Sequence, residues 1–108
     1  MIGAEAFRRM KSHAILINCA RGGIVDEDAL YRALREGDIA SAGMDVFREE
    51  PAPADHPLFT LPNFIASPHI AALTEDANRV TGLLAAESID DVLSGRTPKY
   101  PINSPKIG

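Results

Sequence analysis

The sequence predicts an α/β fold, in which a partial parallel sheet is followed by a long C-terminal helix. Three segments of strand length, residues 14–18, 39–47 and 63–67, are rich in apolar residues. The first of them begins with the run Ala14–Ile17, which is apolar without alternation. Such a run is typical of a parallel strand that is covered on both faces. A helical pattern separates the first two segments, and a longer one follows the third.

Composition and charge indicate one small globular unit and exclude several kinds of partner. The 108 residues are 45% apolar and 24% charged, with a net charge of −4 from 11 basic and 15 acidic residues. The basic residues form no stripe, so we expect no nucleic-acid partner. No apolar run approaches the roughly 20 residues that span a bilayer, and the charges between Glu5 and Lys11 leave no room for a signal-peptide core. With a single cysteine and no intrachain disulfide, we expect a cytoplasmic protein without a membrane partner.

Two short helices are predicted in the first forty residues or so. Residues 3–11 form the first of them. The second covers residues 26–36, where Asp26 is the N-cap and Gly37 provides the C-terminal stop. Its apolar residues form one stripe that can face a core: Ala29, Leu30, Ala33 and Leu34.

The second half of the chain contains a proline-rich loop and a long helix. Residues 48–62 carry four prolines and are predicted to be a loop rather than a crossover helix. Thr74 caps a helix that ends near Leu93, with Gly95 as its stop. The apolar residues of this helix form a drifting face that we expect to reach another domain or chain: Ala77, Val80, Leu84, Ile89, Val92 and Leu93. The tail is predicted to be extended because of three prolines: Pro98, Pro101 and Pro105.

Chemically active residues follow each predicted strand. Arg21 comes after the first strand, and His69 comes after the third. Asp45 and Glu50 come at the end of the second strand and in the loop behind it. If the strands are parallel, their carboxyl ends share the edge where open α/β sheets bind ligands. An arginine can clamp a carboxylate, and a histidine beside a carboxylate can exchange a proton near neutral pH. We therefore predict a site for a small oxo- or hydroxy-acid at this edge.

Each of these residues also has a simpler interpretation. Arg21 can be a surface arginine, and Asp45 can cap a turn. Glu50 can be a solvated loop charge, and His69 can bond a loop carbonyl group. The hypothesis of a site depends on all of them meeting at one edge.

The remaining polar residues indicate no further chemistry. Cys19 fits a small packing residue, and nothing near it in the sequence favours a nucleophile. His13 and His56 fit surface or loop positions, and the histidines and Cys19 lack metal-ligand spacing. No G-x-G-x-x-G motif or other phosphate-cradling loop is present.

Three blocks of sequence carry a strong family signature. They are I-N-C-A-R-G-G-I-V-D-E-D-A-L at 17–30, G-M-D-V-F-R-E-E-P at 43–51, and H-P-L-F-T-L-P-N-F-I-A-S-P-H-I-A at 56–71. In this order they closely resemble the NAD-dependent D-isomer-specific 2-hydroxyacid dehydrogenases. That family includes phosphoglycerate dehydrogenase and the glyoxylate/hydroxypyruvate reductases, and the similarity extends from Ile2 to about Asn103.

The resemblance implies a Rossmann-like partial sheet and an oxidoreductase. Residues 1–73 would be the C-terminal half of the NAD-binding domain, and residues 74–108 a long helix and tail that return to the substrate domain. Arg21 would bind the substrate carboxylate and polarise the carbonyl group, and His69 would be the acid/base. Glu50 would pair with His69 and favour its protonated form.

The resemblance also implies a cofactor, which would be NAD or NADP in the complete enzyme. Its nicotinamide would be held by residues at the same edge: Cys19, Ala20, Arg21, Asp45, His69, Ile70, Ala71 and Ala72. No metal ion is implied. The resemblance does not distinguish NAD from NADP, and it does not identify the 2-hydroxy acid.

By the same resemblance, other parts of such an enzyme should lie before Met1. The glycine-rich phosphate loop is not among the 108 residues, and the ribose-binding acidic residue and most of the substrate domain are expected to be missing too. We therefore interpret the chain as a truncated gene product, a cloned fragment or a proteolytic remnant, and expect it to be inactive alone, with no cofactor bound. The alternative is an inactive remnant that acts as an oligomerisation or binding module. In either case we expect a homo-oligomer.

Overall fold

The computed structural model describes residues 1–103 and divides into two compact units. The first unit comprises Met1–Ala71 and contains a sheet with its helices, and the second begins at Ala72 and contains the long helix.

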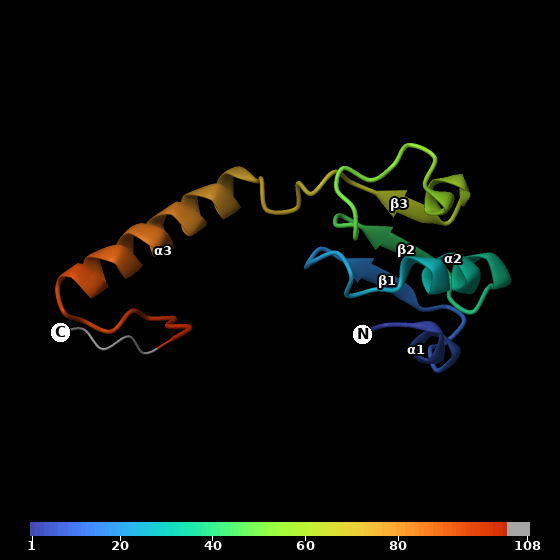
Figure 1. Ribbon diagram of the computed structural model, residues 1–108, viewed down its shortest axis with the longest axis horizontal. Coiled ribbons are helices and arrows are strands. Elements are labelled where there is room, and N and C mark those ends of the chain that lie inside the picture. Colours follow the sequence, from blue (N-terminus) through green and yellow to red (C-terminus); the bar gives the residue numbers. More distant parts are fainter. Residues whose placement is uncertain (104–108) are drawn as a thin grey trace. The chain divides into compact units, whose positions relative to one another are not determined.

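The first unit is built on a three-stranded parallel sheet (Figure 1). Its strands are β1 (Ile15–Asn18), β2 (Ser41–Met44) and β3 (Phe64–Ala66), in the order β1-β2-β3. The predicted strands are confirmed, although each is shorter than the apolar segment that predicted it. Because all three strands run in the same direction, their carboxyl ends lie along one edge of the sheet.

Two helices cover one face of this sheet. Helix α1 (Ala4–Arg8) is shorter than predicted, and helix α2 (Glu27–Glu36) has the predicted ends. The Asp26 carboxylate accepts the Ala29 N–H at 2.9 Å, and Gly37 has the left-handed conformation (φ 79°) of a helix stop. The predicted stripe of α2 is buried, and it packs in one core with residues from α1, β1 and β2: Phe7, Leu16, Ala42 and Met44.

The opposite face of the sheet is not covered by the rest of the first unit. Ile15, Ile17 and Ile65 are 67%, 73% and 76% exposed, whereas Leu16 between them is buried. The prediction of a sheet covered on both faces is therefore wrong for residues 1–71. The apolar run of β1 reflects side chains that favour burial, but this unit supplies helices for one side only.

The loop between β2 and β3 contains a 3-10 helix that the sequence analysis did not predict. This helix, η1 (Pro57–Thr60), has proline at its first position, where the missing N–H costs nothing. Leu58 within it is fully buried, so the loop is anchored in the core.

The second unit contains the predicted long helix, α3 (Glu75–Leu93). The Thr74 hydroxyl accepts the Ala77 N–H at 3.1 Å, and Gly95 behind the helix has a φ of 71°. None of the α3 residues is buried, including the predicted apolar face. The tail has no helix or strand up to residue 103, and Pro105 lies outside the described residues. Within residues 1–103, no helix is long and apolar enough to cross a membrane.

Candidate active site

The parallel sheet brings the predicted site segments to one edge. Asp45 follows β2 directly, and its N–H still bonds the Asn18 carbonyl oxygen at 3.0 Å. Ser67 follows β3 directly, and its N–H bonds the Met44 carbonyl oxygen at 3.0 Å. The segments that carry Arg21, Asp45 and His69 therefore all leave the sheet at its carboxyl edge, as the sequence predicted.

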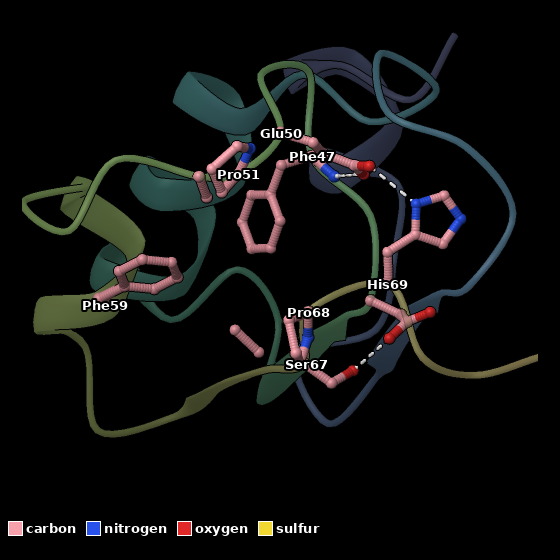
Figure 2. A pocket seen from close by; sticks show the side chains of 10 residues that line it. Phe47, Glu50, Pro51, Phe59, Ser67, Pro68 and His69 are labelled. Atoms are coloured by element: carbon pink, nitrogen blue, oxygen red, sulfur yellow. Dashed lines mark hydrogen bonds and ion pairs between the residues drawn. The ribbon is translucent and has the colours of Figure 1, made fainter. Parts of the chain in front are cut away.

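His69 and Glu50 form the closest pair of ionisable side chains at this edge. Nδ1 of His69 lies 2.7 Å from Oε2 of Glu50, and Figure 2 shows the imidazole ring directed at that carboxylate. The other oxygen of Glu50, Oε1, accepts the Phe47 N–H at 2.9 Å. The hydrogen bond with His69, followed by that from Phe47, lowers the pKa of Glu50. Glu50 is therefore an anion at neutral pH and faces the ring from the loop behind β2.

Asp45 is buried beneath the turn that carries His69. Its carboxylate accepts hydrogen bonds from the Ser67 hydroxyl at 2.5 Å and from the N–H groups of Ile70 and Ala71, both at 2.9 Å. The bond from Ser67 is the main reason why the pKa of Asp45 is lowered, and the two N–H groups add to it. His69 itself has a φ of 56°, in the left-handed region that most residues avoid.

Arg21 lies at the same edge but points elsewhere. Its guanidinium Nη1 donates to the Ala20 carbonyl oxygen at 2.6 Å, and the side chain is exposed. The buried Asn18 side chain shapes this turn, because it donates to the Arg21 carbonyl oxygen at 3.1 Å and accepts the Ala20 N–H at 3.2 Å. The backbone of Arg21 is thus fixed, whereas its guanidinium group can turn towards a ligand.

Gly22 packs the arginine turn against the loop that carries Glu50. A methyl group at Gly22 would lie 1.9 Å from the Phe47 carbonyl oxygen and 2.9 Å from the Arg48 nitrogen, which are backbone atoms. Only glycine allows this approach. The sequence did not predict this contact, because the double glycine indicates a turn but not the segment that the turn touches.

A pocket of about 550 Å³ adjoins the His69–Glu50 pair. It is mostly apolar, and the rings of Phe47 and Phe59 in its wall make an edge-to-face contact with centroids 5.7 Å apart. Its lining residues are Asp45, Phe47, Glu50, Pro51, Ala52, Phe59, Ala66, Ser67, Pro68 and His69. Arg21 is not among them.

A second histidine–carboxylate pair anchors the same loop. Glu27, at the start of α2, is 7% exposed and accepts the Arg48 N–H at 2.7 Å. Its other oxygen lies 3.2 Å from Nε2 of His56, and Nδ1 of His56 accepts the Leu58 N–H at 3.3 Å. His56 is thus a loop residue as interpreted, but its side chain is largely buried rather than on the surface. The sequence shows no signal for this pair, because its members are 29 positions apart.

The predicted cofactor-binding residues fall in two groups. Cys19 is exposed, and it lines a pocket of about 400 Å³ on the exposed face of the sheet together with Asp45. The N–H groups of Ile70 and Ala71 are bonded to Asp45, and Ala72 is exposed and begins the second unit. Residues 1–103 contain no group of three or more histidine, cysteine or acidic side chains that could hold a metal ion.

A family model matches the same unit that carries this site. The model describes the NAD binding domain of D-isomer specific 2-hydroxyacid dehydrogenases, and it matches residues 1–71. The chain belongs to this family. The predicted family and the predicted Rossmann-like class of its sheet are thereby confirmed.

Named relatives of this dehydrogenase domain cover nearly the whole chain. A D-3-phosphoglycerate dehydrogenase from Methanocaldococcus jannaschii is 50% identical over 107 residues, which are 99% of this chain and 20% of the relative. A glyoxylate/hydroxypyruvate reductase B from Citrobacter koseri is 44% identical over 108 residues, which are 100% of this chain and 33% of the relative. The chain thus spans a fifth to a third of the length of these relatives.

A solved structure extends the comparison to the fold. The D-isomer specific 2-hydroxyacid dehydrogenase from Xanthobacter autotrophicus, in complex with NADPH and MES, has a TM-score of 0.80 and 35% sequence identity. The match covers 94% of this chain and 41% of that protein.

Proposed function

We propose that this chain is part of an NAD(P)-dependent oxidoreductase that transfers a hydride between nicotinamide and a small D-2-hydroxy acid or 2-oxo acid. Residues 1–73 are then the C-terminal half of the NAD-binding domain, and residues 74–108 return to the substrate domain. The observation that carries this proposal is the His69–Glu50 pair, with 2.7 Å between Nδ1 and Oε2, at the carboxyl edge of the sheet. The family membership of residues 1–71 supports it.

His69 is the proposed acid/base, and Glu50 is its partner. Because Nδ1 faces the carboxylate of Glu50, proton exchange with substrate falls to Nε2, which makes no hydrogen bond to any of residues 1–103. During reduction the protonated ring gives the Nε2 proton to the carbonyl oxygen, and in the reverse reaction Nε2 takes the hydroxyl proton. Glu50 stabilises the positive charge of the ring in the protonated state.

Arg21 is the proposed carboxylate clamp. Its guanidinium group is exposed and is bonded only to a neutral carbonyl oxygen among the described residues. An arginine can bind a carboxylate through two parallel hydrogen bonds, and these would be stronger than the bond to Ala20. The same group beside the carbonyl oxygen would polarise it for attack.

The proposed cofactor contacts lie on the exposed side of the sheet edge. Cys19, Gly43 and Asp45 line the pocket of about 400 Å³. Gly43 has no side chain and that of Cys19 is small, which leaves room for a flat ring. When bound, a nicotinamide would supply or accept the hydride. The wider set proposed to hold it is Cys19, Ala20, Arg21, Asp45, His69, Ile70, Ala71 and Ala72. Both NAD and NADP fit the proposal, since the family model names NAD and the Xanthobacter autotrophicus protein holds NADPH.

A second candidate function is an inactive remnant that serves as an oligomerisation or binding module. The observation that favours it is the exposed apolar face of the sheet, with Ile15, Ile17 and Ile65 each more than two-thirds exposed. Monomeric proteins rarely leave such a surface uncovered. A homo-oligomer follows from this candidate, and it is also compatible with the first. A cytoplasmic location stays a prediction.

A chimera provides the test of the proposed activity. In it, this chain replaces the corresponding segment of the Citrobacter koseri reductase, which supplies the remaining two-thirds of the enzyme. We expect reduction of glyoxylate or hydroxypyruvate, followed through the absorbance of NADH or NADPH. Arg21→Ala should lower kcat and raise the KM for the 2-oxo acid, whereas Arg32→Ala, at an exposed position of α2, should change neither. A chimera that binds the cofactor but reduces no 2-oxo acid would argue for the remnant.

A further inference from the structure

The turn behind β3 holds His69 in an unfavourable backbone conformation. The φ of His69 is 56°, and it is the one non-glycine residue with a positive φ among residues 1–103. Residues with a Cβ atom disfavour this region, so surrounding bonds must hold the backbone there. This backbone conformation matters because it is the one in which the His69 ring reaches the Glu50 carboxylate.

Asp45 makes four hydrogen bonds to this turn. Its carbonyl oxygen accepts the N–H of His69 itself at 2.8 Å. Its carboxylate accepts the Ser67 hydroxyl before His69 and the N–H groups of Ile70 and Ala71 after it. Asp45 is 3% exposed, so these bonds are shielded from water and replace its hydration. No other residue of the first unit bonds the turn on both sides of His69.

We propose that Asp45 is a positioning residue, whose carboxylate holds the turn 67–71 in the conformation that directs Nδ1 of His69 at Glu50. This inference rests on the proposed function, because it gives the orientation of the His69 ring a role in proton transfer. It differs from the cofactor contact proposed for Asp45, since it consists of bonds within the chain and needs no cofactor. A carboxylate suits the position because three donors converge on it, whereas an amide would present its own N–H to one of them.

By holding the turn, Asp45 determines the tautomer of the His69 ring. With Nδ1 donating to the Glu50 carboxylate, the neutral ring carries its hydrogen on Nδ1 and leaves Nε2 as the proton acceptor. His56 has the opposite arrangement, because its Nδ1 accepts the Leu58 N–H and its Nε2 faces Glu27. The two neutral histidines should therefore have opposite tautomers within the same molecule, and His56 serves as an internal reference.

The experiment is imidazole ¹⁵N NMR on the 108-residue chain, at a pH high enough for the rings to be neutral. In the wild type we expect the Nδ1–H tautomer at His69 and the Nε2–H tautomer at His56, with assignment by His69→Gln. Asp45→Asn should shift His69 towards the Nε2–H tautomer, as Glu50→Ala should by removing the acceptor. His56 should be unchanged in both variants. The matched control is Asp28→Asn, an exposed position in the first turn of α2, which should leave both rings unchanged.

Ser67→Ala keeps the proposal testable if Asp45→Asn does not fold, which a collapse of the chemical-shift dispersion of the backbone amides would reveal. Because this variant removes one of the three side-chain bonds of Asp45, it should lower the Nδ1–H population of His69 by a smaller amount. A merely structural role of Asp45 would lower stability but leave the tautomer of the folded protein unchanged. If Asp45→Asn folds, an unchanged His69 tautomer in that variant overturns the proposal. If Asp45→Asn does not fold, an unchanged His69 tautomer in Ser67→Ala overturns it. Neither result bears on catalysis by His69, which the chimera tests separately.

Discussion

Nδ1 of His69 lies 2.7 Å from Oε2 of Glu50, although the two residues are 19 positions apart and belong to different loops. The loop behind β2 supplies the carboxylate, and the turn behind β3 supplies the ring. Two backbone contacts fix the partners, because Phe47 bonds Glu50 and Asp45 bonds the N–H of His69. The pair therefore forms because the sheet brings these two segments together at one edge, and not through a local sequence motif.

Removal of the charge of Glu50 should change the pH dependence of the chimera. In Glu50→Gln the protonated His69 ring loses the anion that stabilises it. Because reduction of a 2-oxo acid needs the protonated ring, the pH–rate profile should move to lower pH. The matched control is Glu49→Gln, whose exposed side chain is adjacent in sequence, and its profile should coincide with the parent. Coincident profiles for both variants would exclude the proposed pair.

Acid should destabilise this chain through Asp45. Its pKa is lowered from the ordinary value of 3.8, so the unfolded chain binds the proton more readily than the folded one. Its contribution to the free energy of unfolding is therefore fully present above this value, and it is lost as the pH falls through the lower pKa of the folded state. Urea unfolding between about pH 5 and pH 2 should show a weaker pH dependence in Asp45→Asn than in Asp28→Asn. An equal pH dependence of the free energy of unfolding in the two variants would contradict the lowered pKa of Asp45.

A methyl group at Gly22 should force the arginine turn away from the loop that carries Glu50. It would overlap the Phe47 carbonyl oxygen, and backbone atoms cannot move aside as a side chain can. Gly22→Ala should lower the free energy of unfolding by about 1–3 kcal/mol, the usual range for overpacking. Gly3→Ala is the control, because a methyl group there meets no atom within 4 Å. Denaturant titration of both variants makes the comparison, and equal stabilities would refute the close contact.

The 108-residue chain alone should form a homo-oligomer and should not bind NAD tightly. We expect an oligomer because contact with a second chain would bury the exposed apolar face of the sheet. We expect weak NAD binding because the 108 residues contain no glycine-rich turn for the pyrophosphate. Light scattering and calorimetric titration with NAD measure the two properties. Ile17→Lys on the sheet face should weaken the oligomer, whereas Ile102→Lys in the tail should not. A stable monomer, or micromolar affinity for NAD, would show that this interpretation is mistaken.

Local signals account for the parts of the fold that the sequence predicted well. Asp26 and Gly37 determine the ends of α2 through a side-chain cap and a left-handed stop, and both act within a few residues. The same holds for Thr74 at the start of α3. The parallel strands then place Arg21 and His69 at one edge, so the location of the candidate site followed from topology.

Contacts between distant segments account for what the sequence did not predict. The bonds from Asp45 to its turn and from Glu27 to His56 join residues 22 to 29 positions apart. The spacing of apolar residues along the sequence does not predict contacts between such distant positions. The close approach of Gly22 to Phe47 is of the same kind. The wrong prediction for the second sheet face has a related cause: the run Ala14–Ile17 indicates that burial is favourable, but it does not name the element that provides it.

The most direct test of the central claim, that His69 is the acid/base of a 2-hydroxyacid dehydrogenase, is the turnover rate of His69→Gln in the chimera with the Citrobacter koseri reductase. The comparison is His13→Gln, an exposed histidine away from the sheet edge. We expect His69→Gln to lower kcat by roughly 10²–10⁴-fold while cofactor binding is retained, and His13→Gln to have no effect. Equal turnover in the two variants would contradict it.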